Sequence, residues 1–206
     1  PMANKLLLGG GAVAGCAAAA LAVTAMVATS DPFAPCIDTR MAEAIGGPFE
    51  LTDENGQRVT DTEVFSKPSL IYFGYTFCPD VCPVDNVRNA EVAEILEAKG
   101  HELQPVFVSV DPARDTPEVL AEFTDYFHPD MLGLTGSVDD LASVTSDYKV
   151  YFSAHEPEEG DDFYLVDHST FSFLVLPEHG AIDLVRRDEA PDVVAERAAC
   201  IIERAA

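Results

Sequence analysis

Basic residues are scarce in this sequence. Only 12 of its 206 residues are Lys or Arg, against 36 Asp or Glu, and the formal net charge at pH 7 is −24. A chain with this charge repels phosphate backbones and has little means of releasing their counterions, which argues against nucleic acid as a partner. Cysteine is also sparse. The chain has five cysteines, which are too few for a small disulfide scaffold. Each cysteine therefore has to be interpreted by its position.

Apolar residues are abundant and unevenly distributed. They make up 48% of the chain, which is enough for a packed core and excludes a disordered tail. The longest stretch without a charge is residues 6–28. As a helix it would be roughly 35 Å long, enough to cross a hydrocarbon core of about 30 Å. We therefore expect a short cytoplasmic N-terminus at residues 1–5, followed by a transmembrane anchor at 6–28.

Two other fates of this apolar segment are open. A cleaved signal peptide is one, although its apolar core normally spans only about 7–15 residues. A lipidated Cys16 is the other, because Val13–Cys16 resembles a bacterial lipobox, but the residues that follow stay apolar for another dozen positions. We favour the uncleaved anchor.

Charge predicts the orientation of the anchor. Lys5 precedes it and Asp31 follows it, so the N-terminus should stay in the cytoplasm and the rest should be exported. We expect a single-pass protein of the bacterial inner membrane whose soluble part is periplasmic. Leaving out Lys5, that part has 11 basic and 36 acidic residues, a net charge of −25. Its cysteines would meet an oxidising compartment, in which cysteines pair, bind metal or carry redox chemistry.

The exported part divides into a linker at 29–44 and a domain at 45–206. Asn55-Gly56 predicts a hairpin turn near the start of the domain. The buried strand at 69–75, the helix at 84–98 and the strand at 105–110 form a βαβ unit, with Val84 and Val87 expected to face inward. Further signals are a helix opened by Asp115–Glu118, segments at 138–148, 150–152, 170–176 and 182–187, and a last helix at 191–204. This order predicts an α/β thioredoxin-like sandwich with an N-terminal β-hairpin extension.

The chemistry is concentrated in the sequence Cys78-Pro-Asp-Val-Cys82-Pro, between the predicted strand and helix. Cysteines at i and i+4 share one face of a helical turn, so the two sulfurs can converge on one ligand or on each other. A helix N-terminus stabilises thiolates, the form that binds metals and attacks disulfides. An inert disulfide is the alternative.

His168 is the third candidate, because the start of the strand at 170–176 should face the cysteine loop in this fold. Asp167 could orient the imidazole or cap a loop. Two thiolates and one imidazole suit Cu(I), and can hold Cu(II) with an added ligand, whereas structural zinc normally takes four protein ligands. We therefore expect a copper ion at Cys78, Cys82 and His168.

In several ordered segments the chain resembles the Sco/SenC family of copper-binding, thioredoxin-like assembly factors for cytochrome oxidase. The resemblance runs from about Ile45 to Ile202. Its segments are Ile45–Phe49, Leu51–Asp53, Tyr72–Thr76 leading into CPDVCP, Val110–Pro112, Arg114–Glu118, Gly133–Gly136, Tyr148–Ser153 and Asp167–Ser169. An N-terminal anchor is also typical of the family.

The resemblance implies a membrane-tethered metallochaperone that binds copper through Cys78, Cys82 and His168. It would deliver the metal to the dinuclear copper site of cytochrome c oxidase subunit II, or reduce the cysteines of that site. A periplasmic copper donor or a thioredoxin-like reductant could be a further partner. Asp80 falls within the motif and could tune the site, but the resemblance does not make it a ligand.

The alternative function is a thiol-disulfide reductase with Cys78 and Cys82 as its redox pair. The CxxxC spacing, and Ser169 after His168 where thioredoxins have a cis-proline, make a general oxidoreductase less favoured. A peroxidase fits two close cysteines and a histidine less well.

Several other residues have simpler interpretations. Cys36 and Cys200 have no place in the family motif, and both are exported, so we predict a structural disulfide between them, with two buried thiols as the alternative. Asp111, Arg114 and Asp115 are expected to be turn and capping residues. His155 and the acidic run at 156–162 are expected to form a solvated loop.

Overall fold

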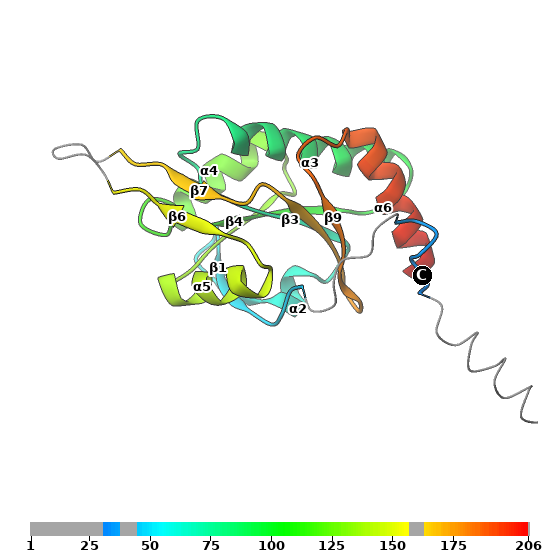
Figure 1. Ribbon diagram of the computed structural model, residues 1–206, viewed down its shortest axis with the longest axis horizontal. Coiled ribbons are helices and arrows are strands. Elements are labelled where there is room, and N and C mark those ends of the chain that lie inside the picture. Colours follow the sequence, from blue (N-terminus) through cyan, green and yellow to red (C-terminus); the bar gives the residue numbers. More distant parts are fainter. Residues whose placement is uncertain (1–30, 38–44, 157–162, 206) are drawn as a thin grey trace, which may run out of the picture.

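Residues 31–37, 45–156 and 163–205 are described by a computed structural model (Figure 1). The predicted cytoplasmic segment 1–5, the anchor at 6–28 with Cys16, much of the linker and the acidic residues 157–162 lie outside the described residues. Within the described ranges, no helix combines the length and apolarity that a membrane span requires.

The described strands form one large sheet and one small one. The strands of the large sheet are β1 (Glu50–Asp53), β2 (Arg58–Thr60), β3 (Ser69–Gly74), β4 (Gln104–Ser109), β5 (Leu132–Thr135), β8 (Ser172–Leu176) and β9 (Gly180–Val185). They lie in the order β2-β1-β5-β4-β3-β8-β9. Strands β3, β4 and β5 are parallel, whereas β8 and β9 complete the sheet in antiparallel pairings.

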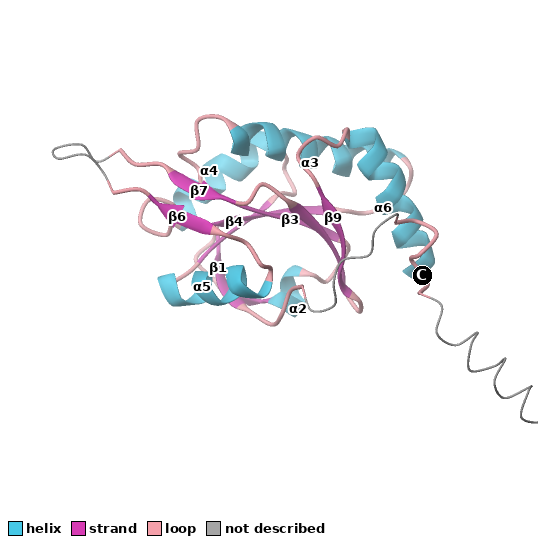
Figure 2. Cartoon of the chain, in the orientation of Figure 1, coloured by secondary structure: helices cyan, strands magenta, loops and turns pink. Residues whose placement is uncertain are grey.

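Helices cover both faces of this sheet. They are α2 (Asp61–Val64), α3 (Val81–Ala98), α4 (Pro117–Phe127), α5 (Val138–Asp147) and α6 (Pro191–Ala205). Helices α3, α4 and α6 lie on one side, and α2 and α5 lie on the other (Figure 2). The parallel pair β3–β4 is joined through α3, and the chain ends in the β8–β9 hairpin and α6. This is the sandwich that the sequence predicts.

The predicted hairpin extension is confirmed. Strands β1 and β2 pair antiparallel, and Gly56 adopts the positive φ of 75° that their turn requires. Strand β1 also pairs with β5, so the hairpin widens the sheet at its edge. Neither β5 nor the short helix α2 was expected, because both contain only four residues.

The smaller sheet is a hairpin of β6 (Phe152–Ala154) and β7 (Val166–His168), which we call the arm. Phe152 lies opposite His168 in its register. In Figure 1 the arm projects from one end of the molecule. His168 lies ahead of β8 of the main sheet, as expected, and it also ends a strand of this separate sheet, which was not expected.

The start of α3 reverses the expected burial. Val84 and Val87 were expected to face inward, but they are 56% and 45% exposed. The face that packs on the sheet instead carries Asp85, Asn86 and Asn89, followed by Val92 and other apolar residues. The apolar pattern misled the prediction because polar side chains, most of whose atoms have hydrogen-bond or ion-pair partners, occupy the buried stripe.

The predicted disulfide between Cys36 and Cys200 is confirmed. It attaches residues 31–37 to α6, and Phe33 and Ile37 are buried against the same apolar cluster as that helix. Arg204 also donates a hydrogen bond to the carbonyl oxygen of Pro32. This part of the predicted linker is therefore packed on the domain.

Because the disulfide joins residues 164 positions apart, its loss should increase the chain entropy of the unfolded state substantially. We expect the double variant Cys36→Ser/Cys200→Ser to lose about 2–4 kcal/mol of unfolding free energy, measured by urea denaturation. Cys78→Ser in the same assay is the control, because Cys78 takes no part in this disulfide. An unchanged midpoint in the double variant would contradict the prediction.

Candidate metal centre

The two cysteines are positioned where β3 passes into α3. Cys78 lies in the connecting turn and Cys82 in the first turn of the helix, and their side chains are 7% and 0% exposed. The backbone N–H of Cys82 donates to the Cys78 sulfur at 3.4 Å. Neither cysteine forms a disulfide. A buried pair of thiols therefore lies at a helix N-terminus, where backbone donors favour negative charge.

Gly74 makes the space that Cys82 occupies. A Cβ atom at this position would lie only 2.8 Å from the Cys82 sulfur and 3.1 Å from the Phe107 ring. Any side chain here would push the thiol or the sheet aside, because buried groups pack without spare volume. The glycine at the end of β3 thus allows the helix to approach the strand.

His168 completes the group. Its Nε2 atom lies 3.3 Å from the Cys82 sulfur, and its Nδ1 atom lies 3.0 Å from the carbonyl oxygen of Ser169. A proton on Nδ1 would be held by that carbonyl, which leaves the Nε2 lone pair facing the sulfurs. The ligand atoms of Cys78, Cys82 and His168 all lie within 4.8 Å of one another. The three residues singled out from the sequence therefore come together.

Aromatic rings enclose the imidazole. Tyr72 and Tyr75 both meet His168 edge to face, with ring centroids 6.1 and 5.7 Å away. Both tyrosines are buried. Tyr72 lies within β3, and Tyr75 directly follows that strand. These two perpendicular contacts limit the orientations open to the His168 ring.

The two thiols differ in acidity. Hydrogen bonding by the Cys82 thiol lowers the pKa of Cys78 to about 3, against the effect of burial and with further donors from His168 and the backbone of Asp80 and Cys82. Burial raises the pKa of Cys82, and the negative charge on Cys78 raises it further. In the metal-free protein, Cys78 is therefore the thiolate and Cys82 the thiol that donates to it.

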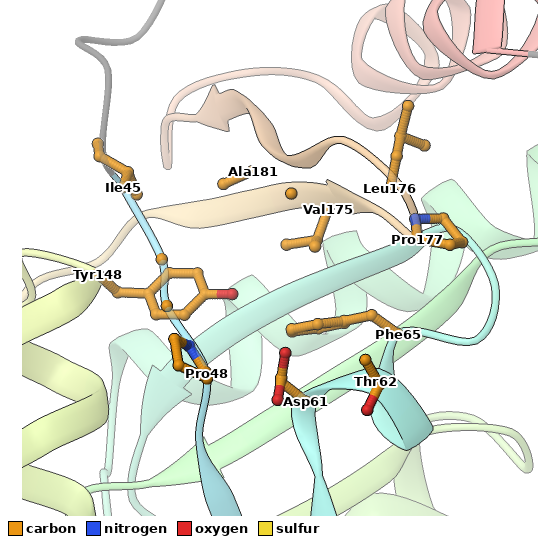
Figure 3. Close-up of a pocket in the computed structure, with 13 residues that line it drawn as sticks. Ile45, Pro48, Asp61, Thr62, Phe65, Tyr148, Val175, Leu176, Pro177 and Ala181 are labelled. Atoms are coloured by element: carbon orange, nitrogen blue, oxygen red, sulfur yellow. The ribbon is translucent and has the colours of Figure 1, made fainter.

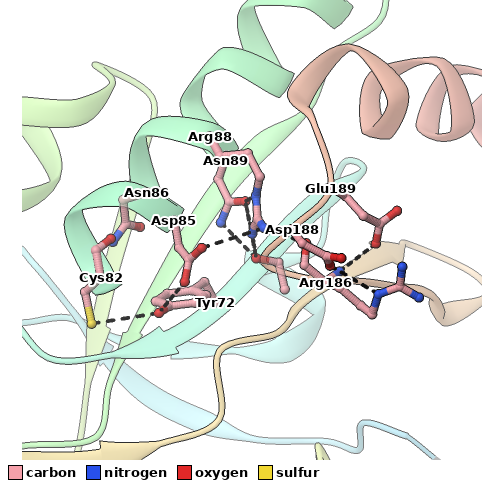
Figure 4. Close-up of polar contacts among 10 residues, drawn as sticks. Tyr72, Cys82, Asp85, Asn86, Arg88, Asn89, Arg186, Asp188 and Glu189 are labelled. Carbon is pink, nitrogen blue, oxygen red and sulfur yellow. Dashed lines mark hydrogen bonds and ion pairs between the residues drawn. The ribbon is translucent and has the colours of Figure 1, made fainter. Parts of the chain in front are cut away.

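A buried polar network continues from Cys82 along α3 (Figure 4). The Tyr72 hydroxyl donates to Asp85 at 3.0 Å and contacts the Cys82 sulfur at 3.8 Å. Arg88 lies 3.7 Å from Asp85 and donates to the hydroxyl of Ser172 at 2.9 Å. Burial raises the pKa of Asp85, against the effect of the Arg88 charge. The network links the helix that carries Cys82 to strands β3 and β8.

Two acidic residues were considered for roles at the centre: Asp80 as a group that tunes it and Asp167 as a group that orients His168. Asp80 is exposed, and it contributes its backbone N–H to Cys78. Asp167 pairs with Nε2 of His155 across the arm at 2.8 Å, so it does not orient His168. That role falls to the carbonyl of Ser169, which sequence reasoning missed because any residue type carries a carbonyl.

Asp111, Arg114 and Asp115 form a turn, as expected, because the N–H groups of Arg114 and Asp115 both donate to the carbonyl oxygen of Asp111. The expected capping role is wrong. Thr116 is the N-cap of α4, and its side chain accepts from the N–H of Val119. Asp115 is fully buried and accepts hydrogen bonds from Thr76, just ahead of the cysteine motif. Asp115 therefore holds Thr76, at the start of the loop that leads to Cys78.

A separate hollow of about 300 Å³ lies at the other end of β8 (Figure 3). Phe65, Tyr148 and Val175 line it, with Asp61 and Thr62 at one side. Its lining contains no thiol or imidazole, so it lacks the donors of the metal centre.

Comparison with known proteins gives consistent matches. The chain is 47% identical over 184 residues to Protein SenC of Rhodobacter capsulatus, covering 88% of this chain and 82% of that one. It is 47% identical over 146 residues to the mitochondrial Protein SCO2 of Saccharomyces cerevisiae, of which it spans 48%, while 70% of this chain is covered.

Among solved structures, Arabidopsis thaliana ScoI with copper bound aligns with a TM-score of 0.71 and 37% identity, covering 79% of this chain and 98% of that one. This match confirms the thioredoxin-like fold. The model of the SCO1/SenC family matches residues 37–203, which include the metal centre and nearly the whole described domain. The chain therefore belongs to the SCO1/SenC family.

Proposed function

We propose that this chain is a copper metallochaperone that binds its cargo through Cys78, Cys82 and His168. The observation that carries the proposal is the convergence of two sulfurs and one imidazole nitrogen within 4.8 Å, on a domain of the SCO1/SenC family. The similar ScoI of Arabidopsis thaliana was solved with copper bound, which supports the choice of metal.

The donor set fits copper better than it fits other metals. Two soft thiolates and an imidazole suit three-coordinate Cu(I), and an added ligand would suit Cu(II). Structural zinc normally takes four protein ligands, and the group contains three. Cys78 is already a thiolate in the metal-free protein, so loading removes a proton mainly from Cys82. The backbone donors around Cys78 remain to neutralise part of the negative charge.

We further propose that residues 6–28 anchor the chain in the bacterial inner membrane, with residues 1–5 in the cytoplasm. Residues 29–44 would link the anchor to the periplasmic domain at 45–206. The acceptor would be the dinuclear copper site of cytochrome c oxidase subunit II. The apolar run, the charges that flank it and the resemblance to oxidase assembly factors support these assignments. A periplasmic copper donor or a thioredoxin-like reductant would complete the cycle.

Oxidation of the cysteine pair by the disulfide of another protein, which would accept the two electrons, offers a way to release the metal. The two cysteines are close enough to interact directly, and a disulfide between them would be a poor ligand. Copper affinity and the redox state of the pair are therefore linked in this proposal. A protein in the oxidised form would first need two electrons from a dithiol partner before it could bind copper again.

The central prediction concerns copper binding by the reduced protein. We expect the wild type to bind one copper ion per chain in anaerobic titration, and Cys78→Ser, Cys82→Ser and His168→Ala each to weaken binding strongly. His155→Ala is the matched control, since His155 is an exposed imidazole on the arm paired with Asp167. Stoichiometric binding that survives all three substitutions would contradict the proposed site.

A thiol-disulfide reductase is the second candidate function, and the unequal acidity of the two thiols favours it. The Cys78 thiolate would attack a target disulfide, forming a mixed disulfide and releasing one target thiolate. Cys82 would then lose its proton and attack the Cys78 sulfur. The products are a reduced target dithiol and a Cys78–Cys82 disulfide, so the protein supplies two electrons. The target would be the oxidised cysteine pair of the subunit II copper site.

Alkylation kinetics test the thiolate assigned to Cys78. Because its pKa lies far below that of a free thiol, its reaction with iodoacetamide should be nearly independent of pH between about pH 5 and pH 8. Cys82→Ala removes the strongest donor to Cys78 and should restore a rate that rises with pH. Peptide mass spectrometry identifies the modified residue. A wild-type rate that climbs about tenfold per pH unit would contradict the assignment.

Reduction of a disulfide-bonded peptide carrying the subunit II cysteine motif discriminates between the two functions. For a metallochaperone we expect slow reduction by the metal-free dithiol protein, together with copper transfer from the loaded protein to the reduced peptide. Cys82→Ser is the control, because it can form a mixed disulfide but cannot resolve it. Rapid reduction by a wild type that fails to bind copper would favour the reductase.

A further inference from the structure

His168 belongs to the arm, whereas Cys78 and Cys82 belong to the main body. The arm is a sheet of its own and shares no strand pairing with the main sheet among the described residues. The geometry of the metal centre therefore depends on what holds the arm against the cysteine loop. Burial of Val166 against the core provides one attachment. The side chain of Arg114 provides a second, polar one.

Arg114 contacts both halves of the centre at once. Its guanidinium lies 3.5 Å from the ring centroid of Tyr164, which precedes β7, and 4.8 Å from that of Phe77, which precedes Cys78. Its Nη1 atom also donates to the carbonyl oxygen of Tyr164 at 2.9 Å. The side chain is only 14% exposed. Removed from water in this way, a cation between aromatic faces interacts with them strongly.

Asp111 fixes the guanidinium in this position. One of its carboxylate oxygens accepts from Nε of Arg114 and the other from the hydroxyl of Tyr164 at 2.7 Å. Asp111 is itself buried. The loop after β4 and the arm are thus joined by a closed ring of contacts among Asp111, Arg114 and Tyr164. The ring needs the planar guanidinium, because the compact ammonium group of a lysine could not make the same set of directed hydrogen bonds.

The ring of contacts reaches His168 by two routes. Along the arm, Tyr164 lies four residues before His168 and leads directly into β7. Across the centre, the guanidinium lies 5.6 Å from the ring centroid of Tyr75, whose ring meets the imidazole edge to face. Among the described contacts, none joins Arg114 directly to either sulfur. Arg114 acts on the centre through its neighbours.

We propose that Arg114, held by Asp111, is a positioning residue that sets the His168 imidazole against the two cysteine sulfurs. This inference rests on the proposed copper site, which it deepens. Without the guanidinium, the arm keeps the burial of Val166 and the hydrogen bond from Tyr164 to Asp111, but it loses the cation that joins Tyr164 to Phe77 in the cysteine loop. Residues that orient metal ligands typically contribute about 10–100-fold to metal affinity.

A double-mutant cycle tests the proposal. Anaerobic competition with a chromophoric Cu(I) chelator should show about a tenfold loss of affinity for Arg114→Met. In the His168→Ala background the same substitution should have almost no further effect, because its route to the metal is gone. Arg114→Lys should recover only part of the loss, since lysine keeps the charge but not the planar fork. Tyr164→Phe is a milder variant, because it removes only the hydroxyl that donates to Asp111 and keeps the ring against the guanidinium, and it should lose less affinity than Arg114→Met.

Arg197→Met is the matched control. Arg197 is a half-buried arginine paired with Asp183 and Glu189, on α6 and away from the metal centre. The substitution Arg197→Met should lower the thermal stability of the protein without changing its copper affinity. In the metal-free protein, the NMR signals of the His168 ring should move in Arg114→Met, because the edge contacts with Tyr72 and Tyr75 change, and stay in place in Arg197→Met.

Unmoved imidazole signals together with unchanged affinity would overturn the proposal. An equal loss of affinity with and without His168 would overturn it as well, because Arg114 would then act on the metal by another route. A wild type that binds no copper would contradict the proposed function. The NMR comparison, made without metal, would still decide whether Arg114 holds His168.

Discussion

The approach of the His168 Nε2 atom to the Cys82 sulfur, at 3.3 Å, joins residues 86 positions apart in the chain. One partner is fixed in the first turn of a helix and the other at the end of a small hairpin. Neither element contains the centre by itself, so the site exists only when the sheet, α3 and the arm are assembled. Much of the surrounding structure serves this contact. Gly74 makes room for the sulfur, the two tyrosines hold the imidazole, and the carbonyl of Ser169 selects its ring nitrogen.

Burying Cys82 imposes a second constraint. A buried thiol beside a thiolate needs a helix that approaches the sheet closely, and the start of α3 does so with a polar stripe. Tyr72 donates to Asp85, Arg88 pairs with Asp85 and donates to Asn89 and Ser172, and the network thereby reaches β8. Such a network is costly when it is incomplete and rigid when it is complete. This network occupies the side of the helix start that faces the sheet, and it leaves the side chains of Val84 and Val87 facing solvent.

The sequence predicts the parts of this protein whose residue types are themselves the signal. Two cysteines at i and i+4 after an apolar strand, and a histidine ahead of another strand, suffice to propose the three donors. The alternation of strands and helices suffices for the sandwich. The failures have a common physical cause, which is that burial depends on tertiary partners. Asp85 and Asn89 have the polarity of surface residues, and Asp115 has the position of a helix cap. Arg114 is a turn residue, as expected, but the sequence does not show its contacts with aromatic rings. The β6–β7 strands are too short to give a periodic pattern.

The segment next to the proposed anchor and the arm lie at opposite ends of the domain (Figure 1). At one end, residues 31–37 are fixed to α6 by the Cys36–Cys200 disulfide and by the burial of Phe33 and Ile37. At the other end lies the arm (Figure 1). Since the proposed anchor ends at residue 28, only a few residues separate it from the fixed segment, so the domain would have little freedom to turn over on the membrane. A chaperone that must meet a membrane-bound acceptor benefits from this restriction, because fewer orientations have to be searched before the metal centres face each other. The disulfide, far from the copper site, would then contribute to delivery by limiting how the site is presented.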